Sequence, residues 1–366
     1  MSADAIPAYK PMHVYFGTYS GVRSRGIYVS RFDTSTGQLG SPELAAETRN
    51  PSFLALHPSG QQLYAVGELD NFGGQRGGAV AAFKIEANGK LTLLNEQPSG
   101  GTGPCHLAVD RAGKCVLVAN YGSGSVVALP LLLDGRLGEP GIPTQHHGAS
   151  INPQRQTGPH AHFITADPAN RSALACDLGL DKVFVYRLDP ERALLTSHDP
   201  PFISIKPGSG PRHLVFHANG RVVYLINEIA STLNVFEYDP RSGALKELQT
   251  ISTLPADFKG ENICAEVQVH PSGRFVYASN RGHDSLAVFA VDQKNGRLAF
   301  VERQPSQGKT PRHFTLDPDG NWLIAENQDS NNVVVFRVDS KTGRLHWTGQ
   351  AVEVGAPVCA VFVGGK

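Results

Sequence analysis

Charge, sulfur and long apolar runs are all scarce in this sequence. Charged residues make up 18% of the 366 positions, and 33 Lys plus Arg balance 33 Asp plus Glu, so no net charge favours nucleic acid or an anionic membrane surface. No stretch approaches the roughly 20 apolar residues that span a bilayer. The N-terminal residues lack the basic segment and apolar core of a secretory signal. We therefore expect neither a nucleic-acid nor a membrane partner.

Cysteine usage argues against two kinds of stabilised fold. The five cysteines are odd in number and none are spaced as C-x-x-C, so we expect neither a disulfide framework nor a structural zinc site. Free thiols, together with the missing signal, predict a cytoplasmic protein. The cysteines are Cys105, Cys115, Cys176, Cys264 and Cys359.

The sequence does contain a repeat of about 50 residues that occurs seven times. Each copy begins with a short apolar stretch, usually after a proline, and continues with two stretches rich in Val, Tyr and Phe. In six copies a turn with Gly-x-Leu then opens a fourth stretch. Such short stretches between Gly, Asn and Pro are typical of half-buried antiparallel strands, and no helical period is sustained. The pattern predicts an all-β fold, a seven-bladed β-propeller of four-stranded antiparallel blades.

The two ends of the chain complete one repeat. The chain starts on a second-strand pattern at 13–16 and finishes on a first-strand pattern at 357–363. We therefore expect the C-terminal strand to pair inside the N-terminal blade and close the ring, which leaves no exposed edge at the seam. The expected organisation is one domain over 1–366, with 1–11 as a flexible N-terminal extension.

The repeat also predicts which residues share a face. The first strand of a blade lines the channel and the second runs antiparallel beside it, so the start of strand one and the end of strand two lie at one mouth. Three turn histidines, His57, His217 and His270, belong to the opposite mouth. The polar residues expected at the first mouth are Cys105, His106, His160, His162, Arg212, His213, Glu266, Arg312 and His313 from strand one, and Glu68, Asn120, Asp177, Asn227, Glu228, Asn280, Arg281, Glu326 and Asn327 from strand two.

This collection of charge at a channel mouth suggests anion binding and acid–base chemistry, because buried charges are costly unless they are paired or hydrated. A water-filled channel whose polar walls satisfy one another is the alternative. Arg212 and Glu228 could likewise form a purely structural ion pair. His160 and His162, spaced i and i+2, should face the same side of a strand. They could ligate a metal, but further ligands are not near in sequence, so we expect no metal and no cofactor.

The chain resembles the cytoplasmic lactonase family of seven-bladed propellers, which includes bacterial 6-phosphogluconolactonase and fungal 3-carboxy-cis,cis-muconate lactonizing enzyme. The resemblance covers nearly the whole chain. It rests on Gly-Pro-His-x-His at 158–162, Gly-Pro-Arg-His at 210–213, Asn-Glu at 227–228, Ala-Glu at 265–266, Arg281 and Pro-Arg-His at 311–313.

The resemblance implies a metal-independent catalytic site. Its members here would be His160 or His162, with Arg212, Glu228 and Arg281, and Arg312 could take the electrostatic role of Arg281. We expect substrate binding by His106, His213, Glu266, Arg312 and His313.

Opening a lactone needs a base for water, a stabilised oxyanion and a proton for the departing alkoxide. Glu228 or the strand histidine would be the base and the other would deliver the proton. Arg212 would face the oxyanion, with Arg281 beside it. Arg312 and His313 would hold a phosphate or carboxylate.

The expected activity is hydrolysis of a small anionic sugar lactone, 6-phosphogluconolactone, in the pentose phosphate pathway, by a monomer or small homo-oligomer. A muconate-type cycloisomerase and a lactonase for an unphosphorylated sugar remain alternatives. A non-catalytic binding propeller is the alternative of another class. The insertion at 131–156 is either a lid or a surface loop, and the glycine-rich loop at 68–78 is not a phosphate cradle, because no helix follows it.

Overall fold

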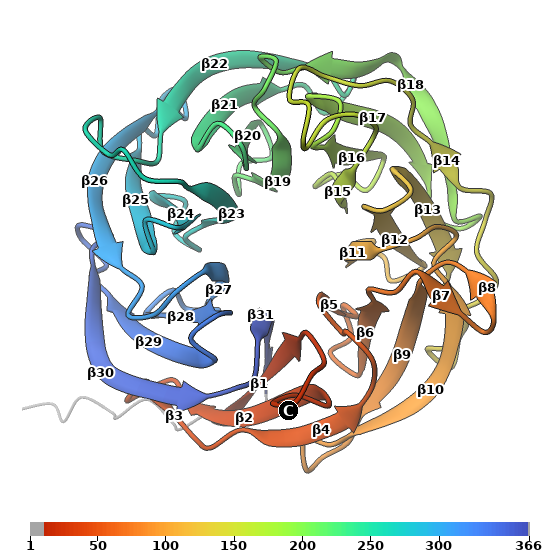
Figure 1. The fold of residues 1–366 in the computed structure, drawn as a ribbon, viewed down its shortest axis with the longest axis horizontal. Coiled ribbons are helices and arrows are strands. Elements are labelled where there is room, and N and C mark those ends of the chain that lie inside the picture. Colours follow the sequence, from red (N-terminus) through yellow and green to blue (C-terminus); the bar gives the residue numbers. More distant parts are fainter. Residues whose placement is uncertain (1–10, 365–366) are drawn as a thin grey trace, which may run out of the picture.

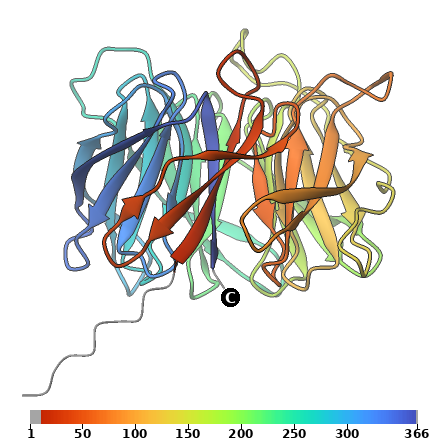
Figure 2. The same ribbon diagram turned by 90° about the horizontal axis from the view of Figure 1, so that it is seen from below.

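A computed structural model describes residues 11–364, and the extension expected at 1–11 lies outside the described residues except for Pro11, which begins the first strand. Seven antiparallel sheets stand around a central channel (Figure 1), and their strands run between the two faces of the ring (Figure 2). The prediction of an all-β, seven-bladed propeller is confirmed. We number the blades 1 to 7 along the chain.

The strands of each blade follow the predicted order from the channel outward. The innermost strands are β31 (Pro357–Gly364), β5 (Leu54–Leu56), β11 (Pro104–Val109), β15 (Ala161–Ala166), β19 (Pro211–Phe216), β23 (Ile263–Val269) and β27 (Pro311–Leu316). The second strands are β1 (Pro11–Thr18), β6 (Gln62–Gly67), β12 (Cys115–Asn120), β16 (Ser172–Asp177), β20 (Val222–Asn227), β24 (Phe275–Arg281) and β28 (Trp322–Asn327).

The outer half of each blade is equally regular. The third strands are β2 (Gly26–Asp33), β9 (Ala79–Ile85), β13 (Ser125–Pro130), β17 (Lys182–Asp189), β21 (Thr232–Tyr238), β25 (Ser285–Val291) and β29 (Asn332–Val338). The outermost strands are β3 (Gln38–Leu39) with β4 (Glu43–Glu47), β10 (Leu91–Pro98), β14 (Thr144–Gln145), β18 (Leu194–Ser204), β22 (Leu245–Ser252), β26 (Leu298–Pro305) and β30 (Leu345–Glu353). A small hairpin, β7 (Asn71–Phe72) and β8 (Gln75–Arg76), lies between β6 and β9.

The ring closes as predicted, because β31 pairs with β1 in blade 1. Tyr15 lies opposite Val361 in this antiparallel pair. The sheet edge at the seam is therefore occupied by a strand of the same chain.

Burial explains the composition of the strands. Every residue of β12, β16, β20 and β28 is buried, because each second strand lies inside its own sheet with a neighbouring blade on either face. Such strands are largely apolar rather than alternating, and each ends in a buried Asn or Asp, with Glu326 preceding it in β28. The outermost strands, such as β10, consist mainly of exposed and partly buried positions.

Two repeated contacts join neighbouring blades. The hydroxyls of four second-strand tyrosines donate to the carbonyl of the Gly-x-Leu glycine of the next blade, as in Tyr64 to Gly135 (3.0 Å) and Tyr277 to Gly343 (2.9 Å). These glycines adopt φ between +74° and +85°, a region that favours glycine. The turn histidines act similarly: His270 Nε2 lies 2.8 Å from the Gly320 carbonyl. These contacts give the turn histidines a structural role.

Candidate active site at one mouth of the channel

A β-bulge near the start of the innermost strand places one set of residues at the mouth. In β11, β15, β19 and β27 the pairing register shifts across one extra residue, and β23 shifts at the corresponding place. Bulges re-aim a side chain, and they are frequent next to active sites. The extra residues in those four strands are Cys105, His162, Arg212 and Arg312.

A second set comes from the end of the second strand. In blades 2, 3 and 5 the residue directly after the second strand reaches the same mouth, and in blade 6 the last residue of β24 does so. It is Glu68 in blade 2, Tyr121 in blade 3, Glu228 in blade 5 and Arg281 in blade 6. Both sets of residues thus meet at one mouth, as the repeat predicts. The other second-strand residues predicted at this mouth do not line its cavity; they are Asn120, Asp177, Asn227, Asn280, Glu326 and Asn327.

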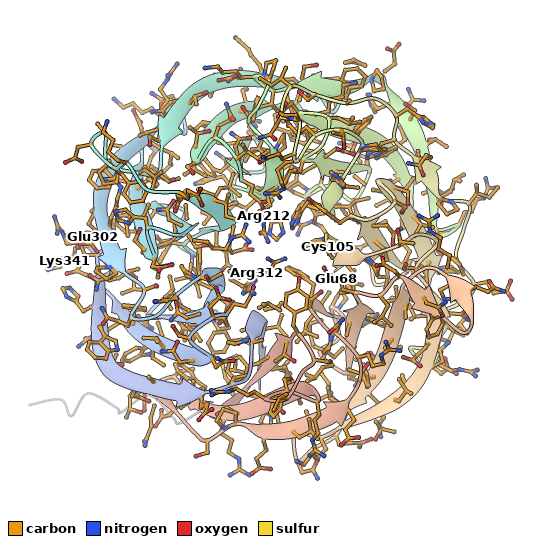
Figure 3. The ribbon with its side chains drawn as sticks, viewed as in Figure 1. Glu68, Cys105, Arg212, Glu302, Arg312 and Lys341 are labelled. Atoms are coloured by element: carbon orange, nitrogen blue, oxygen red, sulfur yellow. The ribbon has the colours of Figure 1, made fainter. Side chains whose placement is uncertain are left out.

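The two sets enclose a cavity of about 300 Å³. Figure 3 shows Glu68, Cys105, Arg212 and Arg312 around the centre of the ring. A smaller space of about 10 Å³ adjoins residues of both sets and reaches Arg212, His213 and His313. The larger cavity is lined by Glu68, Cys105, Tyr121, Arg155, His162, Glu228, Ile263, Arg281 and Arg312.

Glu228 is held by three arginines. Its Oε2 accepts from Arg212 Nε at 3.0 Å and from Arg281 Nη2 at 2.7 Å, and its Oε1 accepts from Arg155 Nη2 at 2.5 Å. Two of these arginines also bind main-chain carbonyls, Arg212 that of Ala265 at 2.6 Å and Arg281 that of Cys264 at 2.8 Å. Both carboxylate oxygens are therefore occupied by charged donors.

The charged groups of this cluster shift one another's pKa values. Burial raises the pKa of Glu228, but Arg281 and Arg212, with smaller effects of His162 and Arg155, outweigh it and leave the pKa well below its usual range. Burial and the nearby arginines lower the pKa of Arg281 to about 9, which still leaves it charged at neutral pH. Glu228 is thus a permanent anion and a weak base.

The two strand histidines have different surroundings. His160 precedes β15, which begins at Ala161, so the two histidines do not lie on one strand as expected, although the His162 ring also lies 5.5 Å from that of Tyr121. His160 stacks on Tyr121, with ring centroids 4.4 Å apart, and its Nδ1 lies 3.0 Å from the Tyr121 carbonyl. His162 occupies the bulge and lines the cavity. The structure therefore separates a peripheral His160 from a central His162.

His162 is a neutral imidazole at the mouth. Burial, reinforced by Arg212, lowers its pKa well below the ordinary value, although Glu228 opposes this. Within residues 11–364 its Nδ1 finds no hydrogen-bond partner. A neutral imidazole can accept a proton from water, and its lowered pKa makes it a weaker base than an exposed histidine.

The residues beneath the mouth form a buried layer across the channel. The His106 ring packs tilted against those of Phe53 and Phe163, with centroids 4.2 and 4.1 Å away, and its centroid is 5.3 Å from that of His213. His213 Nδ1 lies 2.8 Å from Glu266 Oε2. Of the residues expected to bind substrate, Arg312 lines the larger cavity, whereas His106, His213, Glu266 and His313 lie in or against this layer.

One proton in this layer can be assigned. His313 Nδ1 lies 2.8 Å from Glu326 Oε2 and also accepts from the Ala360 N–H at 3.2 Å. A nitrogen that accepts from the main chain carries no proton, so the Glu326 carboxyl must donate to it. Burial raises the pKa of Glu326 well above its usual value, which agrees with a protonated carboxyl.

The far wall of the cavity carries a second acidic group. Glu68 Oε2 accepts from the hydroxyls of Ser52 and Tyr19, the latter at 2.9 Å, and Arg312 Nη2 donates to Tyr19 at 3.0 Å. Burial strongly raises the pKa of the Cys105 thiol, so it stays protonated and is a poor nucleophile. Glu68 is thus the carboxylate on the Arg312 side of the cavity.

The sequence did not identify Arg155 or Tyr121 as residues of the site. Tyr121 occupies the same repeat position as Glu228, so the repeat itself could have identified it. Arg155 lies in the 131–156 insertion, after the outermost strand β14 of blade 3, and the sequence suggested this segment as a lid or a surface loop without singling out Arg155. The structure describes 131–156 as an ordered segment.

Two further expectations were that the chain has no metal site and no membrane-spanning segment. In residues 11–364, no three His, Cys, Asp or Glu side chains are grouped so that they could hold a metal ion. Over the same residues, no helix has the length and apolarity needed to cross a bilayer.

Comparison with known proteins identifies the family of this chain. A family model described as "Lactonase, 7-bladed beta-propeller" matches residues 13–362. This chain belongs to that lactonase family. Among its relatives, the 6-phosphogluconolactonase of Bacillus subtilis is 40% identical over 304 residues, which are 83% of this chain and 84% of the relative. The 6-phosphogluconolactonase of Formosa agariphila is 34% identical over 296 residues, 80% and 82% of the two chains.

A solved structure of a similar protein has the same architecture. The Pseudomonas aeruginosa periplasmic gluconolactonase PpgL superposes with a TM-score of 0.92 at 36% identity, covering 97% of this chain and 100% of that one. The resemblance that the sequence motifs suggested is thus confirmed at the level of the family.

Proposed function

We propose that this protein hydrolyses 6-phosphogluconolactone to 6-phosphogluconate at the mouth formed by Arg212, Glu228, Arg281 and His162. The observation that carries the proposal is the convergence of a neutral imidazole and a triply bound carboxylate–arginine cluster on one cavity of about 300 Å³. Relatives that share most of their length with this chain are named for the same reaction.

The sequence left open whether Glu228 or a strand histidine is the base. The geometry favours His162. His162 takes a proton from water as the water oxygen attacks the lactone carbonyl carbon. The carbonyl electrons move onto oxygen, where the guanidinium groups of Arg212 and Arg281 stabilise the oxyanion. When the ring C–O bond breaks, the proton passes from His162 to the departing alkoxide, and the product acid ionises. Glu228 is a positioning residue that keeps both arginines in place.

The charge of the mouth favours a phosphorylated substrate. Arg155, Arg281 and Arg312 line the larger cavity and Arg212 the adjoining space, whereas Glu68 and Glu228 are the acidic residues of these walls. Four guanidinium groups against two carboxylates leave an excess of two positive charges. A phosphate monoester carries about −1.5 to −2 at neutral pH, which matches this excess.

An unphosphorylated sugar lactone is the second candidate, because the Pseudomonas relative is named a gluconolactonase. We place the protein in the cytoplasm on the ground that its five cysteines are unpaired and buried.

A panel of freshly prepared lactones tests the proposal. The panel contains 6-phosphoglucono-δ-lactone, glucono-δ-lactone and a muconolactone, and acid release is followed with spontaneous hydrolysis subtracted. The phosphorylated lactone should give the highest kcat/KM. A preference for the muconolactone would favour the cycloisomerase alternative, and rates equal to the spontaneous background on every lactone would favour a binding propeller.

A further inference from the structure

The segment that carries Arg155 is a fixed arm rather than a free loop. We call residues 146–156 the arm. His146 is buried at its start, where its Nδ1 lies 2.6 Å from Asp177 Oδ2, its Nε2 lies 2.7 Å from the Tyr186 hydroxyl, and its ring stacks on Phe184 at 3.8 Å. The arm is thus anchored at its start to the second and third strands of blade 4.

The end of the arm is anchored as firmly. The Gln156 side chain is fully buried and donates to the Leu178 carbonyl at 2.9 Å. Ser150 donates to Asp181 at 2.5 Å, and the N–H of Arg155 donates to Asn152 Oδ1 at 3.1 Å. The backbone of Arg155 is therefore held at the mouth before any ligand binds.

Arg155 differs from the other two arginines on Glu228. Its side chain is 35% exposed, against 3% for Arg212 and 7% for Arg281. Only its Nη2 makes hydrogen bonds within residues 11–364, to Glu228 and, at 3.4 Å, to the Tyr121 hydroxyl. A guanidinium has five N–H donors, so Nε and Nη1 remain open to an incoming anion. Arg212 and Arg281 instead lie deep and bind main-chain carbonyls as well.

The sequence suggested Arg312 as the residue that binds a phosphate, but the groups around Arg312 suit an anion less well. Its guanidinium donates to Tyr19 and lies 5.4 Å from the centre of that ring. Tyr19 in turn binds Glu68, whose carboxylate would repel a nearby anion. The carboxylate beside Arg155 is Glu228, which is already neutralised by two further arginines.

We propose that Arg155 is the specificity residue that binds the phosphate of the substrate, while Arg212 and Arg281 serve the reacting carbonyl at the other oxygen of Glu228. This inference rests on the proposed function. In 6-phosphogluconolactone the phosphate lies at the opposite end of the sugar from the carbonyl, so two separate groups of donors are required. Glu228 lies between them, with Arg155 on one carboxylate oxygen and the deeper pair on the other.

Kinetics of Arg155→Gln on a phosphorylated and an unphosphorylated lactone test the inference. For 6-phosphoglucono-δ-lactone, KM should rise about 10- to 100-fold, the usual size of a lost charged hydrogen bond, with kcat within about threefold. For glucono-δ-lactone, kcat/KM should be unchanged. Arg155→Lys should give an intermediate KM, because it keeps the charge and loses the fork of donors.

Arg136→Gln is the matched control. Arg136 belongs to the same insertion, its side chain is 52% exposed and it pairs with Asp134 at the surface. Both lactones should be hydrolysed by this variant as by the wild type. An equal loss on both lactones in Arg155→Gln would show that Arg155 acts only through Glu228. No loss on either lactone would exclude any role in binding.

Binding of the two products separates this inference from the proposed function. Calorimetry with 6-phosphogluconate and gluconate needs no turnover. If the wild type hydrolyses no lactone but binds 6-phosphogluconate, and Arg155→Gln weakens only that binding, the proposed function fails and the phosphate site stands. If the wild type hydrolyses the lactone and Arg155→Gln binds 6-phosphogluconate as tightly, the phosphate site fails alone. If the wild type neither hydrolyses nor binds, both fail.

Discussion

Replacing Glu326 with Gln tests the proton assigned to the layer beneath the mouth. Glu326 is fully buried, burial raises its pKa well above 4.5, and its carboxyl donates to His313. A group whose pKa is raised on folding stabilises the fold fully below its unfolded pKa, and this stabilisation is lost as the pH rises toward the folded pKa. Gln can donate to the same ring nitrogen but has no proton to lose.

The size of the effect follows from linkage. Each pH unit above the unfolded value of 4.5 costs the wild type about 1.4 kcal/mol for as long as Glu326 keeps its proton. The free energy of unfolding of Glu326→Gln, relative to that of the wild type, should therefore grow by about 1.4 kcal/mol per pH unit. The difference accumulates at this rate over the pH range in which Glu326 is protonated in the folded protein and ionised in the unfolded one, whatever constant offset the substitution adds.

Urea unfolding at several pH values measures this slope. The control is Glu353→Gln, whose carboxylate is 76% exposed and pairs with Arg23 at the surface, and its curve should run parallel to that of the wild type. Parallel curves for Glu326→Gln and the wild type over the same range would refute the assignment of a buried proton to Glu326.

Four further predictions concern the reaction. Arg212→Ala and Glu228→Gln should each lower kcat/KM for 6-phosphoglucono-δ-lactone by about 10²- to 10³-fold, and full activity in both would remove them from the site. His162→Ala should lose about 10²- to 10⁴-fold in kcat while His160→Ala stays within about tenfold of the wild type; the reverse order would exchange their roles. Because burial and Arg212 lower the pKa of His162, kcat/KM should stay level as the pH falls through 6.5, and a decline centred there would contradict a neutral base. Dialysis against a chelator should leave the rate unchanged, whereas a loss restored by a divalent cation would point to a metal site.

The repeat predicted the blades and the faces because both follow from short-range chemistry. A strand such as Val222–Asn227 is apolar up to its last residue since it is buried on both faces, and this is visible in the sequence. The pairing of β31 with β1 followed from counting incomplete repeats at the two ends. Arg212, Glu228 and Arg281 were correctly expected to lie close together for the same reason.

The sequence could not show which residues the bulges select. A bulge depends on how one strand pairs with its neighbour, and the motif at 158–162 gave no sign that β15 starts at Ala161. The motif therefore left His160 and His162 equivalent. Likewise, Arg155 reaches Glu228 only because buried His146 and Gln156 fix the arm against blade 4, and these contacts join residues far apart in the repeat pattern.

A crystal structure of the complex with 6-phosphogluconate tests the account most directly. We expect the carboxylate of the product beside Arg212 and Arg281, and its phosphate on Arg155, within the cavity at the mouth. The chain also has a larger groove of about 930 Å³, lined in part by His13 and Lys84. Density for the product in that groove, with the mouth empty, would contradict the assignment of the active site.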